Sequence, residues 1–126
     1  MMKVFIADDS AAVGERLITM LSEFPQVEII GHAQDTREAI ESIRQLNPDV
    51  VILDIRMPGG SGIDVLKDIK SNKPAPVVIM LTNYPYPQYR KKCMALGAEF
   101  FFDKSTEFEE VMEVLGQLIK DSHDKK

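Results

Sequence analysis

The chain has 126 residues, of which 44% are hydrophobic and 28% are charged, a balance typical of one soluble globular domain. Its single cysteine, Cys93, excludes an internal disulfide and a multi-cysteine zinc site, and favours a reducing cytoplasm as the location. The net charge of -5 argues against a nucleic-acid partner, and no apolar run approaches the roughly 20 residues of a membrane span, so we expect neither nucleic acid nor membrane as a direct partner.

Five short apolar runs, rich in branched or aromatic residues, predict five strands. Longer segments with apolar residues at helical spacing separate them. This alternation predicts repeated strand-helix-strand units, which need a parallel sheet with helices on both faces. In chain order the runs are residues 4–7, 27–33, 50–53, 77–81 and 100–102.

The segments between the runs are predicted to be helices, and residues 108–119 carry the clearest apolar face. Capping boxes mark two expected helix starts, because their side chains satisfy free backbone amides in the first turn. The pairs with this spacing are Asp35 with Glu38 and Thr106 with Glu109.

Polar side chains follow four of the five predicted strands. Because the carboxyl ends of parallel strands form the ligand crevice of such a sheet, we expect these side chains to converge. His32 lies within the second run and is expected to face solvent or the sheet edge, not a ligand. The residues at the strand ends are Asp8 and Asp9, Asp54, Thr82 and Lys104.

Carboxylates that converge in a crevice repel one another unless a cation or a proton intervenes. Hard oxygen ligands favour Mg²⁺, and a carboxylate beside Mg²⁺ can attack phosphorus, which makes Asp54 a candidate nucleophile. Lys104 could neutralise phosphoryl oxygens and the Thr82 hydroxyl could donate to one. Each residue alone also has a structural explanation, such as helix capping by Asp8 and Asp9; their joint occurrence favours phosphoryl chemistry.

These residues resemble the receiver domain of two-component response regulators, over nearly the whole chain. The resemblance rests on Asp8 and Asp9 after the first strand, on Asp-Ile-Arg-Met-Pro-Gly-Gly-Ser-Gly at 54–62, on Val-Val-Ile-Met-Leu-Thr at 77–82, and on Gly97 and Ala98 through Lys104. It implies an α/β fold of the flavodoxin-like, doubly wound kind: a five-stranded parallel sheet in the order 2-1-3-4-5 with five surrounding helices.

The resemblance also implies roles for the site residues. Asp54 would accept a phosphoryl group from a sensor histidine kinase or a phosphotransfer protein, and Lys104 and Thr82 would hold the phosphoryl oxygens. The implied cofactor is Mg²⁺. Its implied ligands are Asp9, Asp54 and the backbone carbonyl of Arg56, with Asp8 acting through water.

Phosphorylation would then switch the protein through Thr82 and Phe101. It would remodel the surface of the fourth helix, fifth strand and fifth helix, to which a downstream protein, or a second copy in a homodimer, could bind. Arg56, Asn83 and Tyr84 lie where the family tunes loss of the phosphoryl group, and Asn83 replaces a residue that is usually small. Residues 57–62 would form a flexible, glycine-rich loop beside the site.

Two other functions remain as alternatives. One is a pseudo-receiver that binds a partner without phosphorylation. The other is a phosphatase with an aspartate nucleophile, as in haloacid-dehalogenase-like proteins, although those have a second aspartate two residues after the first. We expect a receiver domain at residues 1–120 and a polar tail at 121–126, with output through protein contacts. Its only expected catalysis is its own phosphoryl transfer and autodephosphorylation.

Overall fold

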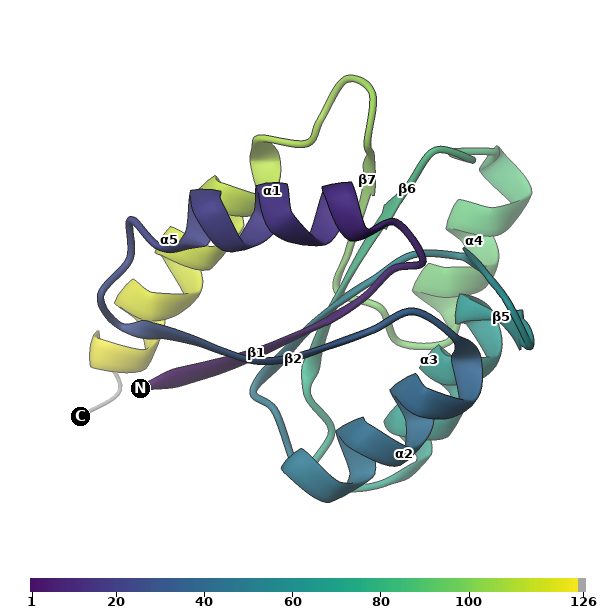
Figure 1. Cartoon of the computed structure of the whole chain (residues 1–126), viewed down its shortest axis with the longest axis horizontal. Coiled ribbons are helices and arrows are strands. Elements are labelled where there is room, and N and C mark those ends of the chain that lie inside the picture. The colour runs from purple at the N-terminus through teal and green to yellow at the C-terminus, as the bar shows by residue number, and fades with distance from the viewer. Residues whose placement is uncertain (125–126) are drawn as a thin grey trace.

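Five strands form one parallel sheet in residues 1–124, which are the residues that the computed structural model describes (Figure 1). Counted along the chain, these strands have the order 2-1-3-4-5, as predicted. Every neighbouring pair in this sheet is parallel. From one edge to the other, the strands are β2 (Val27–Ala33), β1 (Met2–Ala7), β3 (Val50–Leu53), β6 (Val77–Thr82) and β7 (Phe100–Asp103).

Helices cover both faces of the sheet, because each crossover between parallel strands passes over one face. α1 (Ala11–Leu21) and α5 (Glu110–Asp124) lie on one face. On the other face are α2 (Thr36–Leu46), α3 (Gly62–Ser71) and α4 (Pro87–Ala95). In the described part of the chain, no helix is long and apolar enough to span a membrane.

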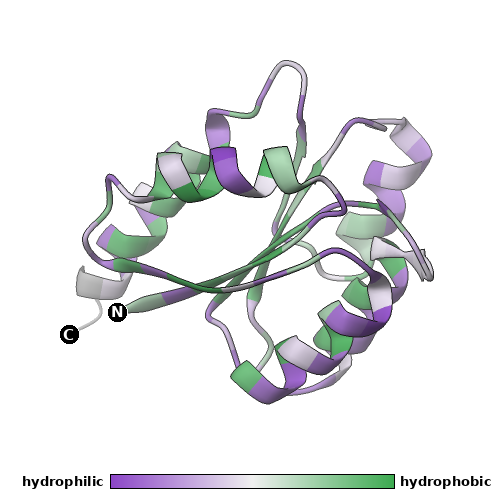
Figure 2. Cartoon of the chain, in the orientation of Figure 1, coloured by the Kyte–Doolittle hydropathy of each residue, from purple (hydrophilic) through white to green (hydrophobic). Residues whose placement is uncertain are grey.

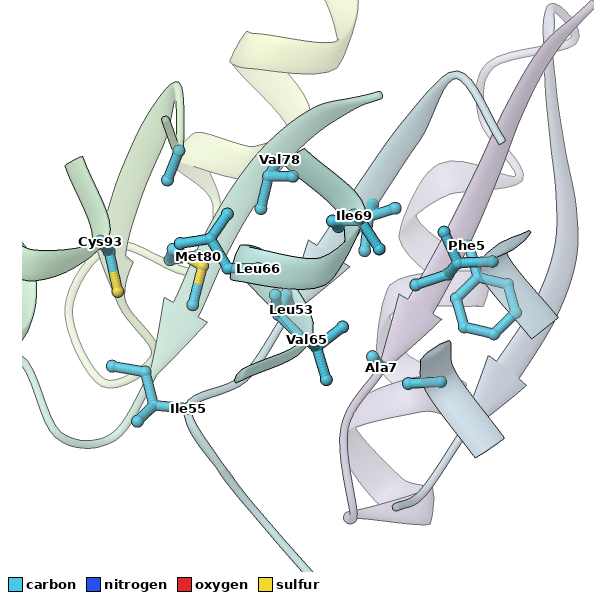
Figure 3. Packing of buried hydrophobic residues seen from close by; sticks show 14 of the residues in the cluster. Phe5, Ala7, Leu53, Ile55, Val65, Leu66, Ile69, Val78, Met80 and Cys93 are labelled. Atoms are coloured by element: carbon cyan, nitrogen blue, oxygen red, sulfur yellow. The ribbon is translucent and has the colours of Figure 1, made fainter. Parts of the chain in front are cut away.

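Two hydrophobic cores result, one on each face. Leu17 of α1 and Leu115 of α5 pack against Ile6 and Ile79 on the first face. On the second face, Figure 3 shows Leu66 of α3 and Cys93 of α4 beside Met80. The hydropathy colours of Figure 2 agree, since the strands are mostly apolar and the helices carry both apolar and polar residues. The near-continuous apolar strands are therefore explained by burial on both sides.

Of the two predicted capping boxes, the one at Asp35 forms in part, because the Glu38 carboxylate accepts from the Gln34 amide, at 3.2 Å, instead of the Asp35 amide. Asp35 caps α2 by accepting a hydrogen bond from the Glu38 amide at 2.8 Å. The predicted box at Thr106 is wrong, because α5 begins only at Glu110. There the Glu107 carboxylate accepts from the Asp103 amide at 3.1 Å, and the chain turns once more before the helix.

The end of α5 bears on the predicted tail. The helix continues to Asp124, so residues 121–124 extend it, and residues 125 and 126 lie outside the described part of the chain. The boundary at residue 120 stays a prediction.

A small antiparallel hairpin, which the sequence suggested only as a loop, follows β3. Its strands are β4 (Arg56–Met57) and β5 (Gly60–Ser61). Gly59 and Gly60 turn the hairpin with φ angles of 86° and 146°, which residues with a side chain rarely adopt. Gly62, the first residue of α3, is needed for a different reason: a Cβ there would lie 1.7 Å from the backbone oxygen of Asp54. The hairpin and α3 therefore start directly against the end of β3.

Candidate functional site

Three carboxylates converge at the carboxyl edge of the sheet. Asp8 and Asp9 follow β1, and Asp54 follows the neighbouring strand β3. One oxygen from each lies within 4.8 Å of the others. Asp8 and Asp54 are only 3% and 5% exposed, whereas Asp9 is exposed. The cluster thus has a buried floor and one carboxylate open to solvent.

Lys104 neutralises part of this charge from the end of β7. Its ammonium lies 2.7 Å from Asp8 Oδ2 and 2.8 Å from Asp54 Oδ2, and its side chain is only 7% exposed. The Lys104 amide donates to the Thr82 carbonyl at 2.9 Å, which holds the turn after β7 against β6. One cation therefore bridges two buried carboxylates that come from different strands.

The pKa values of this cluster reflect opposing effects. Burial raises the pKa of Asp8, and the hydrogen bond from Lys104 only partly offsets it. Burial of the Lys104 ammonium would lower its pKa, but its hydrogen bonds to Asp54 and Asp8, with their negative charges, hold the pKa above its ordinary value. Lys104 is thus held as an ammonium, and the cluster has more negative than positive charge.

The Asp54 carboxylate is fixed from two sides. Its Oδ1 accepts a hydrogen bond from the Ile55 amide at 2.7 Å, while Oδ2 faces Lys104. Its own amide donates to the Ala7 carbonyl at 2.9 Å, so its backbone is tied to the end of β1. A carboxylate held in this way is oriented before any ligand binds.

Thr82 ends β6, the strand beside β3, and so lies at the same edge of the sheet as Asp54. The Thr82 side chain is buried, and its Oγ1 accepts from the Tyr84 amide at 3.0 Å, while Asn83 is exposed. The Arg56 guanidinium stacks 4.0 Å from the centre of the Tyr84 ring. A groove of about 560 Å³, lined by Asp9, Arg56 and Tyr84 among others, opens beside the cluster.

The predicted switch residue Phe101 lies apart from the carboxylates. It is 3% exposed within the core under α4, so its ring points inward in this structure. The Arg90 guanidinium lies 5.6 Å from the ring centre and donates to the Phe101 carbonyl at 3.4 Å. Phe101 is thus positioned to connect β7 with α4.

His32 is the residue beside the site that the sequence did not indicate. β2 is an edge strand, as the expectation for His32 allowed, but the side chain is half-buried and its Nε2 lies 2.9 Å from the Asp8 carbonyl oxygen. The two residues are 24 positions apart, and nothing in the local sequence of either predicts the contact.

The residues present fit a divalent metal ion. Their donors are carboxylate oxygens, the hard ligands that Mg²⁺ prefers, and they lie close enough to share one ion. Lys104 compensates only part of their charge, so a further cation at the exposed Asp9 side would relieve the remaining repulsion.

Comparison with known proteins identifies the family of this chain. The family model for the response regulator receiver domain matches residues 4–116. The chain therefore belongs to the response regulator receiver domains of two-component signalling.

Two curated relatives are similar to this chain along one part of their own length. The chain is 38% identical, over 120 residues, to a protein-glutamate methylesterase/protein-glutamine glutaminase of Carboxydothermus hydrogenoformans, a match that covers 94% of this chain and 35% of the relative. A protein of the same description from Leptospira interrogans is 51% identical over 79 residues, which are 63% of this chain and 23% of the relative. The chain thus spans about a third or less of these curated relatives.

Solved structures give the same result for the fold. The response regulator domain of Thermotoga maritima CheB is 30% identical, with a TM-score of 0.82 and coverage of 96% of this chain and 95% of that one. The isolated REC domain of RcsB from Salmonella enterica serovar Typhimurium, determined with the phosphomimetic BeF3-, is also 30% identical, with a TM-score of 0.86 and coverage of 94% and 88%.

Proposed function

We propose that this receiver domain is a phosphorylation-dependent switch whose phosphoacceptor is Asp54. The phosphoryl group would come from a phosphohistidine on a sensor histidine kinase or a phosphotransfer protein. The observation that carries the proposal is the position of Asp54: a buried carboxylate bridged by Lys104 to Asp8 and within reach of Asp9.

In the proposed reaction, a carboxylate oxygen of Asp54 attacks phosphorus while the bond from phosphorus to the histidine nitrogen breaks. The electron pair of that bond stays on the imidazole, and the product is an aspartyl phosphate. Oδ2 is the attacking oxygen that fits best, because Oδ1 is held by the Ile55 amide. The Lys104 ammonium, now at Oδ2, would turn to a phosphoryl oxygen, and Thr82 Oγ1 would donate to another.

Mg²⁺ is the proposed cofactor, held by Asp9, Asp54 and the Arg56 carbonyl, with Asp8 acting through water. When bound, it would neutralise charge on the transferring phosphoryl group. The excess of carboxylates over cations in the cluster supports this assignment. Catalysis by the chain would be limited to its own phosphorylation and dephosphorylation.

The proposed output is a change on the surface of α4, β7 and α5. Thr82 would move toward the phosphoryl group, and Phe101, already inward here, would be held in that position. A downstream protein, or a second copy in a homodimer, would then bind this surface. The matches to one part of longer methylesterase/glutaminase proteins support a receiver that regulates an effector. We place this function in the cytoplasm, within a domain of residues 1–120.

Site mapping tests the phosphoacceptor. After treatment with acetyl phosphate and Mg²⁺, borohydride reduction of the acyl phosphate and peptide sequencing should identify residue 54 alone. Modification at Asp8 or Asp9 would contradict the assignment. A chain that takes up no phosphoryl group would instead favour a pseudo-receiver, and steady release of phosphate from unrelated phosphomonoesters would favour a phosphatase.

A further inference from the structure

The Asp8 backbone is held by the end of the edge strand β2. The Asp8 amide donates to the Ala33 carbonyl at 3.0 Å, as the last step of the β1 and β2 pairing. The Asp8 carbonyl lies beyond this ladder, where β1 has ended and the chain turns into α1. Its partner is a side chain, His32, whose Nε2 is 2.9 Å from the oxygen. Because a carbonyl oxygen only accepts, Nε2 must carry the proton.

This hydrogen bond acts on the acidic cluster through one peptide plane. The Asp8 carbonyl and the Asp9 amide belong to the same rigid peptide, so fixing the carbonyl fixes how the backbone enters Asp9. Asp9 is the exposed member of the cluster. The Asp8 side chain is held separately, with Oδ1 accepting from the Ser10 amide at 2.8 Å and Oδ2 facing Lys104. Because Asp9 is exposed whereas Asp8 and Asp54 are buried, its carboxylate depends more on its own backbone for orientation.

A glycine in α1 makes room for the His32 ring. A Cβ at Gly14 would lie 2.3 Å from His32 Cε1 and 2.6 Å from Nδ1, so the ring occupies the space of the missing side chain. Gly14 has no positive φ and sits inside a helix, where glycine is otherwise unfavourable. The close approach of the His32 ring therefore explains the glycine, and the ring is held between α1 and the Asp8 carbonyl.

We propose that His32 is a positioning residue for the metal site, and that Gly14 is the residue that allows it. His32 orients the peptide between Asp8 and Asp9, and through it the Asp9 carboxylate, without touching the metal itself. This inference rests on the proposed Mg²⁺ site. Hydrogen-bond partners that orient metal ligands typically change metal affinity by about 10- to 100-fold when they are removed.

The test compares Mg²⁺ affinity, measured by isothermal titration calorimetry, with stability, measured by urea unfolding and circular dichroism. His32→Leu removes the donor and should raise the Kd for Mg²⁺ by about 10-fold. His32→Gln keeps an N–H donor and should restore most of the affinity. Ile29→Ala is the matched control: Ile29 is also half-buried on β2 and packs on the core of α1 and α5, so this variant should lower stability and leave the Kd unchanged.

Gly14→Ala separates positioning from a merely structural role. The new methyl displaces the His32 ring, so the Kd should rise as in His32→Leu, while the higher helix propensity of alanine offsets part of the stability lost by displacing the ring. In the His32→Leu background, Gly14→Ala should have no further effect on the Kd. An effect of Gly14→Ala on the Kd that disappears in the His32→Leu background is not expected if the two residues only support the fold.

The outcomes distinguish the two proposals. If the wild type binds Mg²⁺ and both His32→Leu and Gly14→Ala bind it equally well, the role of His32 is overturned while the metal site stands. If Ile29→Ala raises the Kd as much as His32→Leu does, the loss of affinity follows from lost stability. The positioning role of His32 is then likewise overturned. If the wild type does not bind Mg²⁺, the proposed metal site and the role of His32 fall together.

Discussion

Removal of the Lys104 charge tests the electrostatic account of the site. Lys104→Met leaves two buried carboxylates without the ammonium that bridges them. Breaking a buried ion pair by removing one partner costs about 3–5 kcal/mol, because the other charge stays uncompensated. With an m-value of about 2 kcal/mol/M in urea, the unfolding midpoint should fall by about 2 M. Circular dichroism is the suitable probe, since the chain has no tryptophan.

Two further comparisons make this prediction specific. Adding Asp54→Asn to Lys104→Met removes one of the repelling charges and should recover part of the lost stability. Saturating Mg²⁺ should stabilise Lys104→Met more than the wild type, because the ion then meets uncompensated charge. Lys92→Met, on the exposed surface of α4, is the control and should leave the midpoint nearly unchanged. A Lys104→Met midpoint equal to that of the wild type would show that the ammonium does not stabilise the buried carboxylates.

Three other predictions follow from single contacts. Gly62→Ala places a methyl 1.7 Å from the Asp54 carbonyl oxygen. It should cost about 1–3 kcal/mol in urea unfolding, and a loss no larger than that of Gly116→Ala, whose Cβ would be 3.6 Å from its nearest neighbour, would contradict this. Burial raises the pKa of the Cys93 thiol from 9.0 to about 11. The stability that the neutral thiol contributes is complete below pH 9 and is lost as the pH rises through 11. The wild type should therefore lose more stability than Cys93→Ala over that range, measured by urea unfolding. Equal losses in the two proteins would contradict this prediction. Tyr84→Ala should speed loss of the phosphoryl group, followed by mass spectrometry after the donor is removed, because the ring covers the site beside Arg56; an unchanged rate would argue against shielding.

The sheet and the convergence of the site residues could be predicted from the sequence because both depend on local patterns. Apolar runs at 27–33 and 50–53 have the same bounds as β2 and β3, since strands buried on both faces need continuous apolar residues. Once a parallel sheet was expected, its geometry required the carboxyl ends of the strands to meet at one edge. The proximity of Asp8, Asp54 and Lys104 follows from that edge.

Contacts between distant segments, very short strands and the exact start of α5 could not be predicted in this way. The bond from His32 to the Asp8 carbonyl depends on how β2, β1 and α1 meet, and no spacing within one segment encodes it. The hairpin of β4 and β5 has strands of two residues, too short to show a period. At the start of α5, the capping box at Thr106 has the right spacing, but the Glu107 carboxylate bonds to the Asp103 amide and the helix begins only at Glu110.

Intact-mass analysis shows whether Asp54 is a metal-dependent phosphoacceptor. Wild type, Asp54→Asn and wild type with a chelator are each incubated with acetyl phosphate and Mg²⁺. We expect the mass of one added phosphoryl group on the wild type with metal, and none on the other two samples. Equal uptake by Asp54→Asn, or uptake that persists in the chelator, would contradict it.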